Sequence, residues 1–283
     1  MRELPIGIFD SGVGGLTVYR ALHDRLPNER FVYLGDTARV PYGTKSLATV
    51  ERYAIENSLF LASRGIKMLV VACNTASALA LPAIRKAVGL DVVGVIGPGG
   101  RKAVEITRDK ARPRIGVIAT EATVASNAYV DAIRRVSDSA EVMQAACPLF
   151  VPLAEENWIR EPETASIAAK YLARMNAFRP DALVLGCTHY PILREVIADT
   201  VGPSVKLVDS GEATAEEVAD LLETNGLEST NAPDGERRLC DDLDHFYVTD
   251  AAERFARVAE RFLGVQPSVL EAIEVYGVDV LAG

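Results

Sequence analysis

Short apolar runs rich in valine and isoleucine alternate along this chain with longer segments of helical periodicity. Seven runs are predicted to be β-strands: residues 6–10, 31–36, 67–72, 92–97, 114–120, 181–186 and 205–209. Between them lie segments such as ATVERYAIENSLFLASRG, in which apolar residues recur at helical spacing. Strands that alternate with helices are typical of mainly parallel sheets flanked by helices, so the sequence predicts an α/β fold.

The chain also aligns with itself. MLVVACNTAS, which contains Cys73, lies over ALVLGCTHYP, which contains Cys187, without a gap. Upstream, IGIFDSGVGGLTVYRAL lies over IGVIATEATVASNAYVDAI, with Ile6 over Ile115. A repeat of this kind predicts two similar, pseudo-symmetric α/β domains.

The repeat sets the expected domain boundaries. The first, discontinuous domain should comprise residues 1–97 and 210–283, and the second residues 98–209, with crossovers in the turn-rich segments 96–100 and 208–211. The tail after residue 209 has no counterpart in the repeat, and we expect it to pack onto the first half. Its segment DAAERFARVAERFLG predicts a helix with Asp250 as its N-cap.

Composition and charge limit the partners of the chain. Its 283 residues carry a net charge of −9, whereas a nucleic-acid groove needs clustered lysine and arginine. The uncharged window 68–84 contains Asn74, Thr75 and Pro82, which argues against a membrane span. The first residues hold no apolar run typical of a signal peptide. We therefore expect a cytoplasmic protein that binds neither nucleic acid nor membranes.

Polar residues follow several of the predicted strands. Asp10-Ser11, Cys73-Asn74-Thr75, Ala119-Thr120 and Cys187-Thr188-His189 fall at strand ends, where parallel α/β sheets bind ligands. If the two halves face each other, the two cysteines reach one cleft from opposite sides. Capping residues follow each cysteine, and a helix N-terminus lowers a thiol pKa from its usual value of about 8.5. One thiolate would then take a Cα proton while the opposite thiol returns one, which inverts the carbon.

The other cysteines give no such signal. The four cysteines lie far apart without a CxxC pair, so we expect free thiols, no disulfide framework and no metal. A lone buried cysteine is more often inert packing, but two at repeat-equivalent positions favour chemistry. Cys147 and Cys240 lack such neighbours and are interpreted as structural. His189, beside Cys187, is expected to assist proton transfer.

The glycine-rich segment DSGVGGLT at residues 10–17 resembles a dinucleotide-binding loop after a strand. Thr17 occupies the sixth position of the motif, however, and Asp10 would repel a phosphate. Asp10 is better placed near a substrate ammonium or a cysteine. With no phosphate loop and no motif for a lysine-bound cofactor, we expect the protein to work without a cofactor.

Six segments together resemble the cofactor-independent aspartate/glutamate racemase family, and within it the glutamate racemases. The matching segments are DSGVGGL (10–16), PYGTK (41–45), ACNTAS (72–77), VPLAE (151–155), GCTHYP (186–191) and VDSG (208–211). Alanines at positions 119 and 122 stand where the family often has glycine, which changes no catalytic group.

The resemblance implies two α/β domains with the active site in the cleft between them. It implies interconversion of L- and D-glutamate by two catalytic cysteines, Cys73 and Cys187, assisted by Asp10 and His189. Asp36 and Glu155 match carboxylates with a supporting role. The implied substrate contacts are Asp10, Ser11, Tyr42, Gly43, Asn74, Thr75, Thr188 and His189. A bacterial homodimer that supplies D-glutamate for peptidoglycan is implied as well.

Alternatives stay open from the sequence alone. Aspartate racemases have Glu after the second Cys-Thr, so His189 favours glutamate, but aspartate or another small amino acid could occupy the same site. A Cys-His hydrolase would form a covalent adduct and would not need Cys73. A non-catalytic amino-acid-binding protein would bind glutamate without exchanging its Cα hydrogen.

Overall fold

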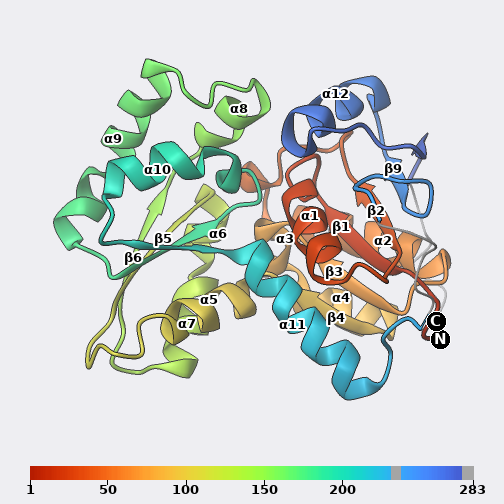
Figure 1. Ribbon diagram of the computed structural model, residues 1–283, viewed down its shortest axis with the longest axis horizontal. Helices are drawn as coiled ribbons and strands as arrows, with labels where there is room; N and C mark the ends of the chain where they lie inside the picture. The colour runs from red at the N-terminus through yellow and green to blue at the C-terminus, as the bar shows by residue number, and fades with distance from the viewer. Residues whose placement is uncertain (231–236, 276–283) are drawn as a thin grey trace.

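The computed structural model, which describes residues 1–230 and 237–275, contains two parallel β-sheets side by side (Figure 1). The first sheet has the strand order β10-β9-β2-β1-β3-β4, and every pairing in it is parallel. Its strands are β1 (Ile6–Asp10), β2 (Phe31–Gly35), β3 (Met68–Val71), β4 (Asp91–Gly94), β9 (His245–Val248) and β10 (Leu270–Ala272).

The second sheet has the order β6-β5-β7-β8 and is also parallel. Its strands are β5 (Arg114–Ala119), β6 (Glu141–Ala146), β7 (Ala182–Gly186) and β8 (Lys206–Asp209). This order matches β2-β1-β3-β4 strand for strand, so the sequence repeat is a repeat of the fold. The predicted α/β class with two pseudo-symmetric halves is confirmed.

Helices cover the faces of both sheets. They are α1 (Leu16–Arg25), α2 (Leu47–Ser63), α3 (Asn74–Leu79), α4 (Leu81–Val88), α5 (Ile96–Glu105), α6 (Glu121–Ser126), α7 (Ala128–Val136), α8 (Phe150–Glu155), α9 (Pro162–Phe178), α10 (Arg194–Val201), α11 (Ser210–Asn225) and α12 (Ala252–Leu263), with 3₁₀ turns η1 (Tyr42–Thr44) and η2 (Tyr190–Leu193). We call the first sheet with α1–α4 and α12 the first unit, and the second sheet with α6–α10 the second unit. None of the helices in residues 1–230 and 237–275 is long and apolar enough to cross a membrane.

The two units share packing. The helix α11 lies against α1 of the first unit and against α5, which leads into the second. One hydrophobic cluster includes Ile8 and Tyr19 of the first unit together with Phe150 and Leu185 of the second. Because this cluster continues from one unit into the other, its burial stabilises the packing of the two units against each other.

The seven strands predicted from sequence are all present, whereas β6, β9 and β10 were not among them. Strand β6 lies at the edge of its sheet with half-exposed side chains, and its sequence, EVMQAA, lacks a run of valine and isoleucine. Strand β10 is also an edge strand and has only 3 residues. Edge strands need less apolar sequence because one side of them faces solvent, so the apolar pattern that marks buried strands is weak there.

The segments between the halves differ from the turn-rich crossovers that the sequence predicted. Residues 96–100 lie inside helix α5, so the predicted turn is wrong. At the second crossover, β8 passes directly into α11, and the Asp209 side chain accepts hydrogen bonds from the N–H groups of Gly211 and Glu212 at 2.8 and 3.4 Å. The domain boundaries at 97 and 209 stay a prediction.

The C-terminal tail packs onto the first unit, as predicted, because β9 pairs with β2 in parallel register. Its helix α12 has Ala251 rather than Asp250 as N-cap, and Ala251 adopts a positive φ of 52°. The predicted cap is therefore wrong: Asp250 Oδ1 accepts from the N–H of Ala251 at 2.7 Å, one residue before the helix. Residues 231–236 and 276–283 of the predicted tail lie outside the described part of the chain.

A serine fixes the turn in which Cys73 lies. Ser77 Oγ donates to the carbonyl of Val71 at 2.7 Å and accepts from the N–H of Val95 at 3.3 Å. These bonds tie α3 to the end of β3 and to the start of α5. The position of Cys73 therefore depends on one buried hydroxyl.

Replacing Ser77 by alanine should lower the free energy of unfolding by about 1–3 kcal/mol, because the fully buried Val95 N–H loses its acceptor. Urea denaturation measures the change. Ser63→Ala is the matched control: its hydroxyl bonds the Phe60 carbonyl on an exposed surface, so the change should stay within about 0.5 kcal/mol. Equal losses in both variants would contradict the assignment.

Candidate active site

The carboxyl ends of the two sheets face each other. Thr75, after β3, has its Oγ1 3.0 Å from Oγ1 of Thr120, which follows β5. Tyr129 on α7 donates its hydroxyl to Asn74 Oδ1 at 2.7 Å. These hydrogen bonds join the first cysteine loop, after β3, to the end of β5 and to α7 of the second unit.

A glycine permits the closest approach of the units on the other side of the cleft. A Cβ at Gly14 would lie 2.2 Å from Thr188 Oγ1 and 2.5 Å from His189 Cε1, closer than atoms can pack. Next to it, Thr17 Oγ1 donates to the Thr188 carbonyl at 2.8 Å. The glycines after β1 thus serve close packing against the second cysteine loop rather than a phosphate.

Cys73 itself caps helix α3 and is 5% exposed. Its Sγ accepts from the N–H of Ala76 at 3.5 Å. Burial and the charge of Asp10 raise the pKa of Cys73 to about 12, and bonds from Ser11 and Ala76 only partly oppose this rise. The prediction that this thiol has a pKa near neutral pH is wrong, because burial raises the pKa more than the N-terminus of the six-residue helix α3 lowers it.

Cys187 lies in a different setting. The 3₁₀ turn η2 rather than an α-helix follows it, so the capping role predicted for Thr188 is wrong. Instead, Cys187 Sγ lies 3.9 Å from Nδ1 of His189, and both residues are buried. The imidazole, not a helix end, is the nearest group that can stabilise charge on this sulfur.

His189 is held between the thiol and a carboxylate, since its Nε2 lies 3.1 Å from Glu155 Oε1. Burial disfavours the imidazolium, but the hydrogen bonds to Cys187 and Glu155 outweigh it and raise the pKa of His189 to about 10. Burial raises the pKa of Glu155, but the hydrogen bond to His189 and the charge of His189 lower it by more, so the pKa of Glu155 lies below its ordinary value. The ring is therefore a cation at neutral pH.

Two arginines of α12 hold Glu155 across the units. Arg254 Nη2 lies 3.2 Å from Glu155 Oε2, and Arg261 Nη1 donates to the Glu155 carbonyl at 2.6 Å. In Figure 1, α12 lies beside α8, which carries Glu155. Sequence reasoning missed both arginines, because α12 has no counterpart in the repeat and its arginines read as an ordinary solvated helix face.

Asp10 is 1% exposed at the end of β1. Its Oδ2 accepts from the N–H of Gly12 at 2.9 Å, and Oδ1 is buried without a hydrogen-bond partner among the described residues. Burial raises the pKa of Asp10, and the charge of His189 partly offsets this. Asn74 Nδ2 is a second buried polar atom without a partner in the part of the chain that the structure describes. A buried acceptor and a buried donor fit a ligand that carries both an ammonium and a carboxylate.

The remaining predicted substrate contacts lie around the same cleft. The side chain of Ser11 hydrogen-bonds Cys73 and so opposes the rise in its pKa. Thr188 lies against the turn at Gly14. Gly43 faces the second unit, because a Cβ there would lie 3.0 Å from Thr120. Thr120 was noted only as a strand-end residue, although in the repeat it is the counterpart of Ser11.

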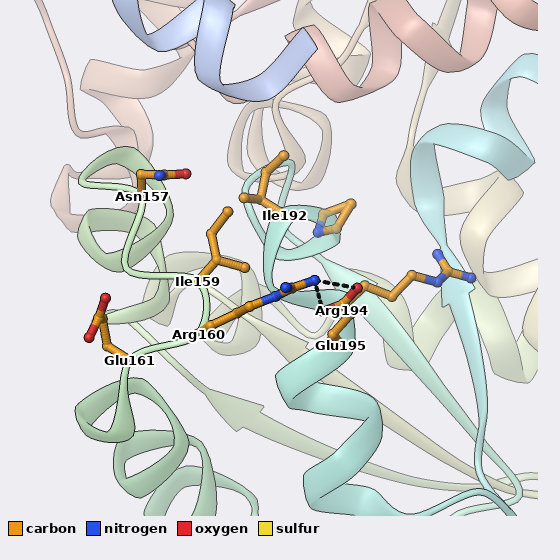
Figure 2. Close-up of a pocket in the computed structure, with 8 residues that line it drawn as sticks. Asn157, Ile159, Arg160, Glu161, Ile192, Arg194 and Glu195 are labelled. Atoms are coloured by element: carbon orange, nitrogen blue, oxygen red, sulfur yellow. Dashed lines mark hydrogen bonds and ion pairs between the residues drawn. The ribbon is translucent and has the colours of Figure 1, made fainter. Parts of the chain in front are cut away.

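A hollow in the second unit is lined by residues 157, 159–161, 191, 192, 194 and 195, none of which is a predicted site residue (Figure 2). Its two arginines have acidic partners: Arg160 pairs with Glu195 at 3.1 Å, and Arg194 lies 3.7 Å from Asp209 and 3.6 Å from Glu212, which are not part of the lining. These charges are largely compensated within the protein. The hollow therefore lacks the unpartnered buried atoms that mark the cleft.

Comparison with known proteins places the chain in a family. A model described as Asp/Glu/Hydantoin racemase matches residues 6–218. A glutamate racemase of Geobacter metallireducens is 52% identical over 260 residues, which are 92% of this chain and 92% of that protein. The chain belongs to the Asp/Glu/Hydantoin racemase family. The resemblance inferred from the six sequence segments is confirmed.

Solved structures of racemases share the fold. A crystal structure of glutamate racemase from Bacillus anthracis has a TM-score of 0.89 and 34% identity, covering 97% of this chain and 99% of its own. Glutamate racemase from Francisella tularensis in complex with D-glutamate has a TM-score of 0.87 and 37% identity over the same shares of the two chains. The racemase family model ends before α12, so Arg254 and Arg261 lie outside the matched segment.

The raised pKa of His189 predicts its titration. Replacing Glu155 by glutamine should move the midpoint from about 10 towards the ordinary 6.5, because a hydrogen-bonded negative charge is lost. The imidazole NMR shift against pH measures it, with His189→Asn assigning the signal. With a raised folded pKa, the stability contributed by this group is complete below about pH 6.5 and is lost as pH rises through about 10.

Glu271→Gln is the matched control for this titration. Glu271 Oε2 lies 3.3 Å from Nε2 of His245, in the first sheet. The substitution removes a carboxylate from a histidine but leaves the cleft untouched, so the His189 midpoint should not move. An unchanged His189 midpoint in Glu155→Gln would show that the carboxylate does not hold the ring charged.

Proposed function

We propose that this chain is a glutamate racemase that interconverts L- and D-glutamate by Cα proton transfer between Cys73 and Cys187, without a cofactor. The observation that carries the proposal is the pair of buried cysteines that follow the equivalent strands β3 and β7 of a duplicated fold, near enough for the charge of Cys187 to act on Cys73. The names of the similar proteins and the D-glutamate bound in the Francisella tularensis enzyme support the choice of substrate.

The two cysteines have different neighbours, and from these we infer which of them acts first as the base. A charged His189 lies 3.9 Å from Cys187 Sγ, and we assign the role of first base to this sulfur. Cys73, with a pKa of about 12, rests as a thiol. Cys187 would then take the Cα proton of one enantiomer while Cys73 gives its proton to the opposite face. The product leaves Cys73 as the thiolate, and the reverse reaction restores the first state.

Buried groups around the substrate would stabilise the carbanion and orient it. Asp10, with an unpartnered Oδ1, suits the substrate ammonium, which would also reduce the negative charge near Cys73. Asn74 Nδ2 and the hydroxyls of Thr75 and Thr188 suit a carboxylate on which charge develops during proton transfer. Ser11, Tyr42 and Gly43 complete the proposed contacts.

The biological setting follows the same family argument. D-glutamate would supply peptidoglycan synthesis in the bacterial cytoplasm, and the enzyme would act as a homodimer. Binding of nucleic acid does not suit a chain with a net charge of −9. A Cys187-His189 hydrolase would leave the buried, opposed Cys73 without a role.

The first experiment uses purified, cofactor-free protein in D₂O with L-glutamate, and with L-aspartate in parallel. We expect loss of optical rotation together with deuterium at Cα for glutamate alone. Activity on aspartate alone would keep the chemistry and overturn the substrate. Glutamate binding without exchange of the Cα hydrogen would replace the racemase by a binding protein.

Cys73→Ser and Cys187→Ser should each lower kcat for racemisation by about 10²–10⁴-fold, because one face of the substrate loses its acid or base. Cys240→Ala is the matched control, since this buried cysteine packs near Tyr19, away from the cleft. Its racemase activity should stay close to that of the parent. Substantial turnover in either serine variant, measured by circular dichroism of glutamate, would count against the two-thiol scheme.

A further inference from the structure

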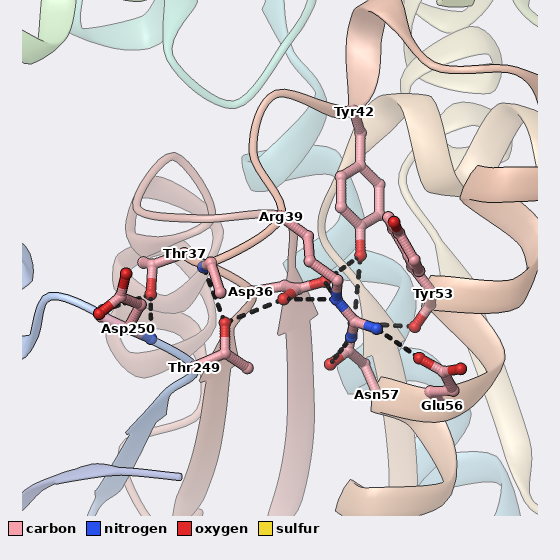
Figure 3. A network of polar contacts seen from close by, with 10 residues as sticks. Asp36, Thr37, Arg39, Tyr42, Tyr53, Glu56, Asn57, Thr249 and Asp250 are labelled. Atoms are coloured by element: carbon pink, nitrogen blue, oxygen red, sulfur yellow. Dashed lines mark hydrogen bonds and ion pairs between the residues drawn. The ribbon is translucent and has the colours of Figure 1, made fainter. Parts of the chain in front are cut away.

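A buried carboxylate lies at the end of β2, beside the cleft. Asp36 is 0% exposed, and groups from three separate segments donate hydrogen bonds to it (Figure 3). The donors are Arg39 Nε at 2.7 and 3.0 Å, Asn57 Nδ2 at 3.0 Å, Thr249 Oγ1 at 2.9 Å and the hydroxyl of Tyr42. Asp36 thereby joins the loop after β2, helix α2 and the segment that leads into α12.

Arg39 compensates the charge of this carboxylate and occupies the centre of the network. Its Nε contacts both oxygens of Asp36, its Nη1 pairs with Glu56, and its Nη2 donates to Asn57 Oδ1 at 3.2 Å. The guanidinium also lies 4.2 Å above the ring of Tyr53. Its side chain is only 11% exposed. A planar group with several fixed donors is needed for all these contacts at once, which lysine cannot supply.

The network holds the loop that carries two of the proposed substrate contacts. The hydroxyl of Tyr42 is bound to Asp36, and its ring packs on Phe9 at 6.2 Å between centroids. The next residue, Gly43, is the point at which this loop faces Thr120 of the second unit. The position of the cleft wall at Tyr42 and Gly43 therefore depends on what holds Asp36.

We propose that Arg39 is a positioning residue of the active site: it compensates Asp36 and fixes loop 40–45, so that Tyr42 and Gly43 form a rigid wall of the substrate pocket. The proposal rests on the racemase function proposed above and adds a residue outside the six matching sequence segments. Arg39 acts through the loop and contacts neither cysteine.

Loss of Arg39 has a specific consequence for kinetics. A buried carboxylate without its cation is unfavourable, so the loop would open until water reaches Asp36. A loose wall weakens binding of the substrate, whereas proton transfer between the two thiols keeps its own groups. KM should therefore rise much more than kcat falls.

The test compares Arg39→Met with Arg52→Met. Arg52 lies on α2 with its guanidinium 5.0 Å from the same Tyr53 ring, but it is exposed and outside the Asp36 network. We expect KM for L- and for D-glutamate to rise about tenfold or more in Arg39→Met, with a much smaller change in kcat. Arg52→Met should match the parent. Arg39→Lys keeps the charge but loses the planar guanidinium with its several donors, so its KM should lie between those of Arg39→Met and the parent.

Four outcomes would overturn the proposal. KM in folded Arg39→Met equal to that in Arg52→Met removes the positioning role, and a fall in kcat at constant KM moves Arg39 into the chemistry. If Arg39→Met does not fold, Glu56→Ala removes the partner of Nη1 instead, and an unchanged KM in that variant has the same meaning. A parent enzyme without racemase activity overturns the proposed function, and this inference with it.

Discussion

The approach of two strand ends across one cleft is the constraint on which the rest of this structure depends. In each unit the cysteine loop follows an equivalent strand. This strand is β3 in the order β2-β1-β3-β4 and β7 in the order β6-β5-β7-β8. Gly14, in the loop after β1, leaves space for Thr188 and His189, and threonine and tyrosine hydroxyls join the loop after β3 to the end of β5 and to α7. A shared hydrophobic cluster keeps the units in this relation.

Within this near-symmetric frame, burial makes the two thiols unequal. Cys73 lies beside a buried carboxylate, and its pKa rises to about 12. Cys187 lies beside an imidazole whose own pKa rises to about 10, because Glu155 accepts its second hydrogen bond. The two identical side chains therefore have different neighbours, a carboxylate beside Cys73 and an imidazolium beside Cys187, which suits the proposed roles of acid and base.

The parts of the fold without a counterpart in the repeat support both walls of the cleft. Thr249, after β9, bonds Asp36 beneath the loop of the first unit. Arg254 and Arg261 of α12 reach across to Glu155, which holds His189 in the second. The C-terminal tail is therefore more than an extension of the first sheet, since it supports loop 40–45 in the first unit and the partner of His189 in the second.

The sequence by itself determined the α/β class, the duplication and seven strands, and it predicted the residues of the proposed site, because the apolar periodicity and the motifs around Cys73 and Cys187 are local patterns. It did not reveal β6, the helix at 96–100 or the raised pKa values of Cys73 and His189. These features depend on which strands lie at the edge of a sheet and on which groups are buried, and residues adjacent in the sequence do not reveal either. Arg39, Arg254 and Arg261 gain their partners only in the folded chain: Asp36 is close in sequence but buried by distant segments, and Glu155 lies about a hundred residues away from α12. Only tertiary structure decides which charges meet out of water, and so which groups carry a proton.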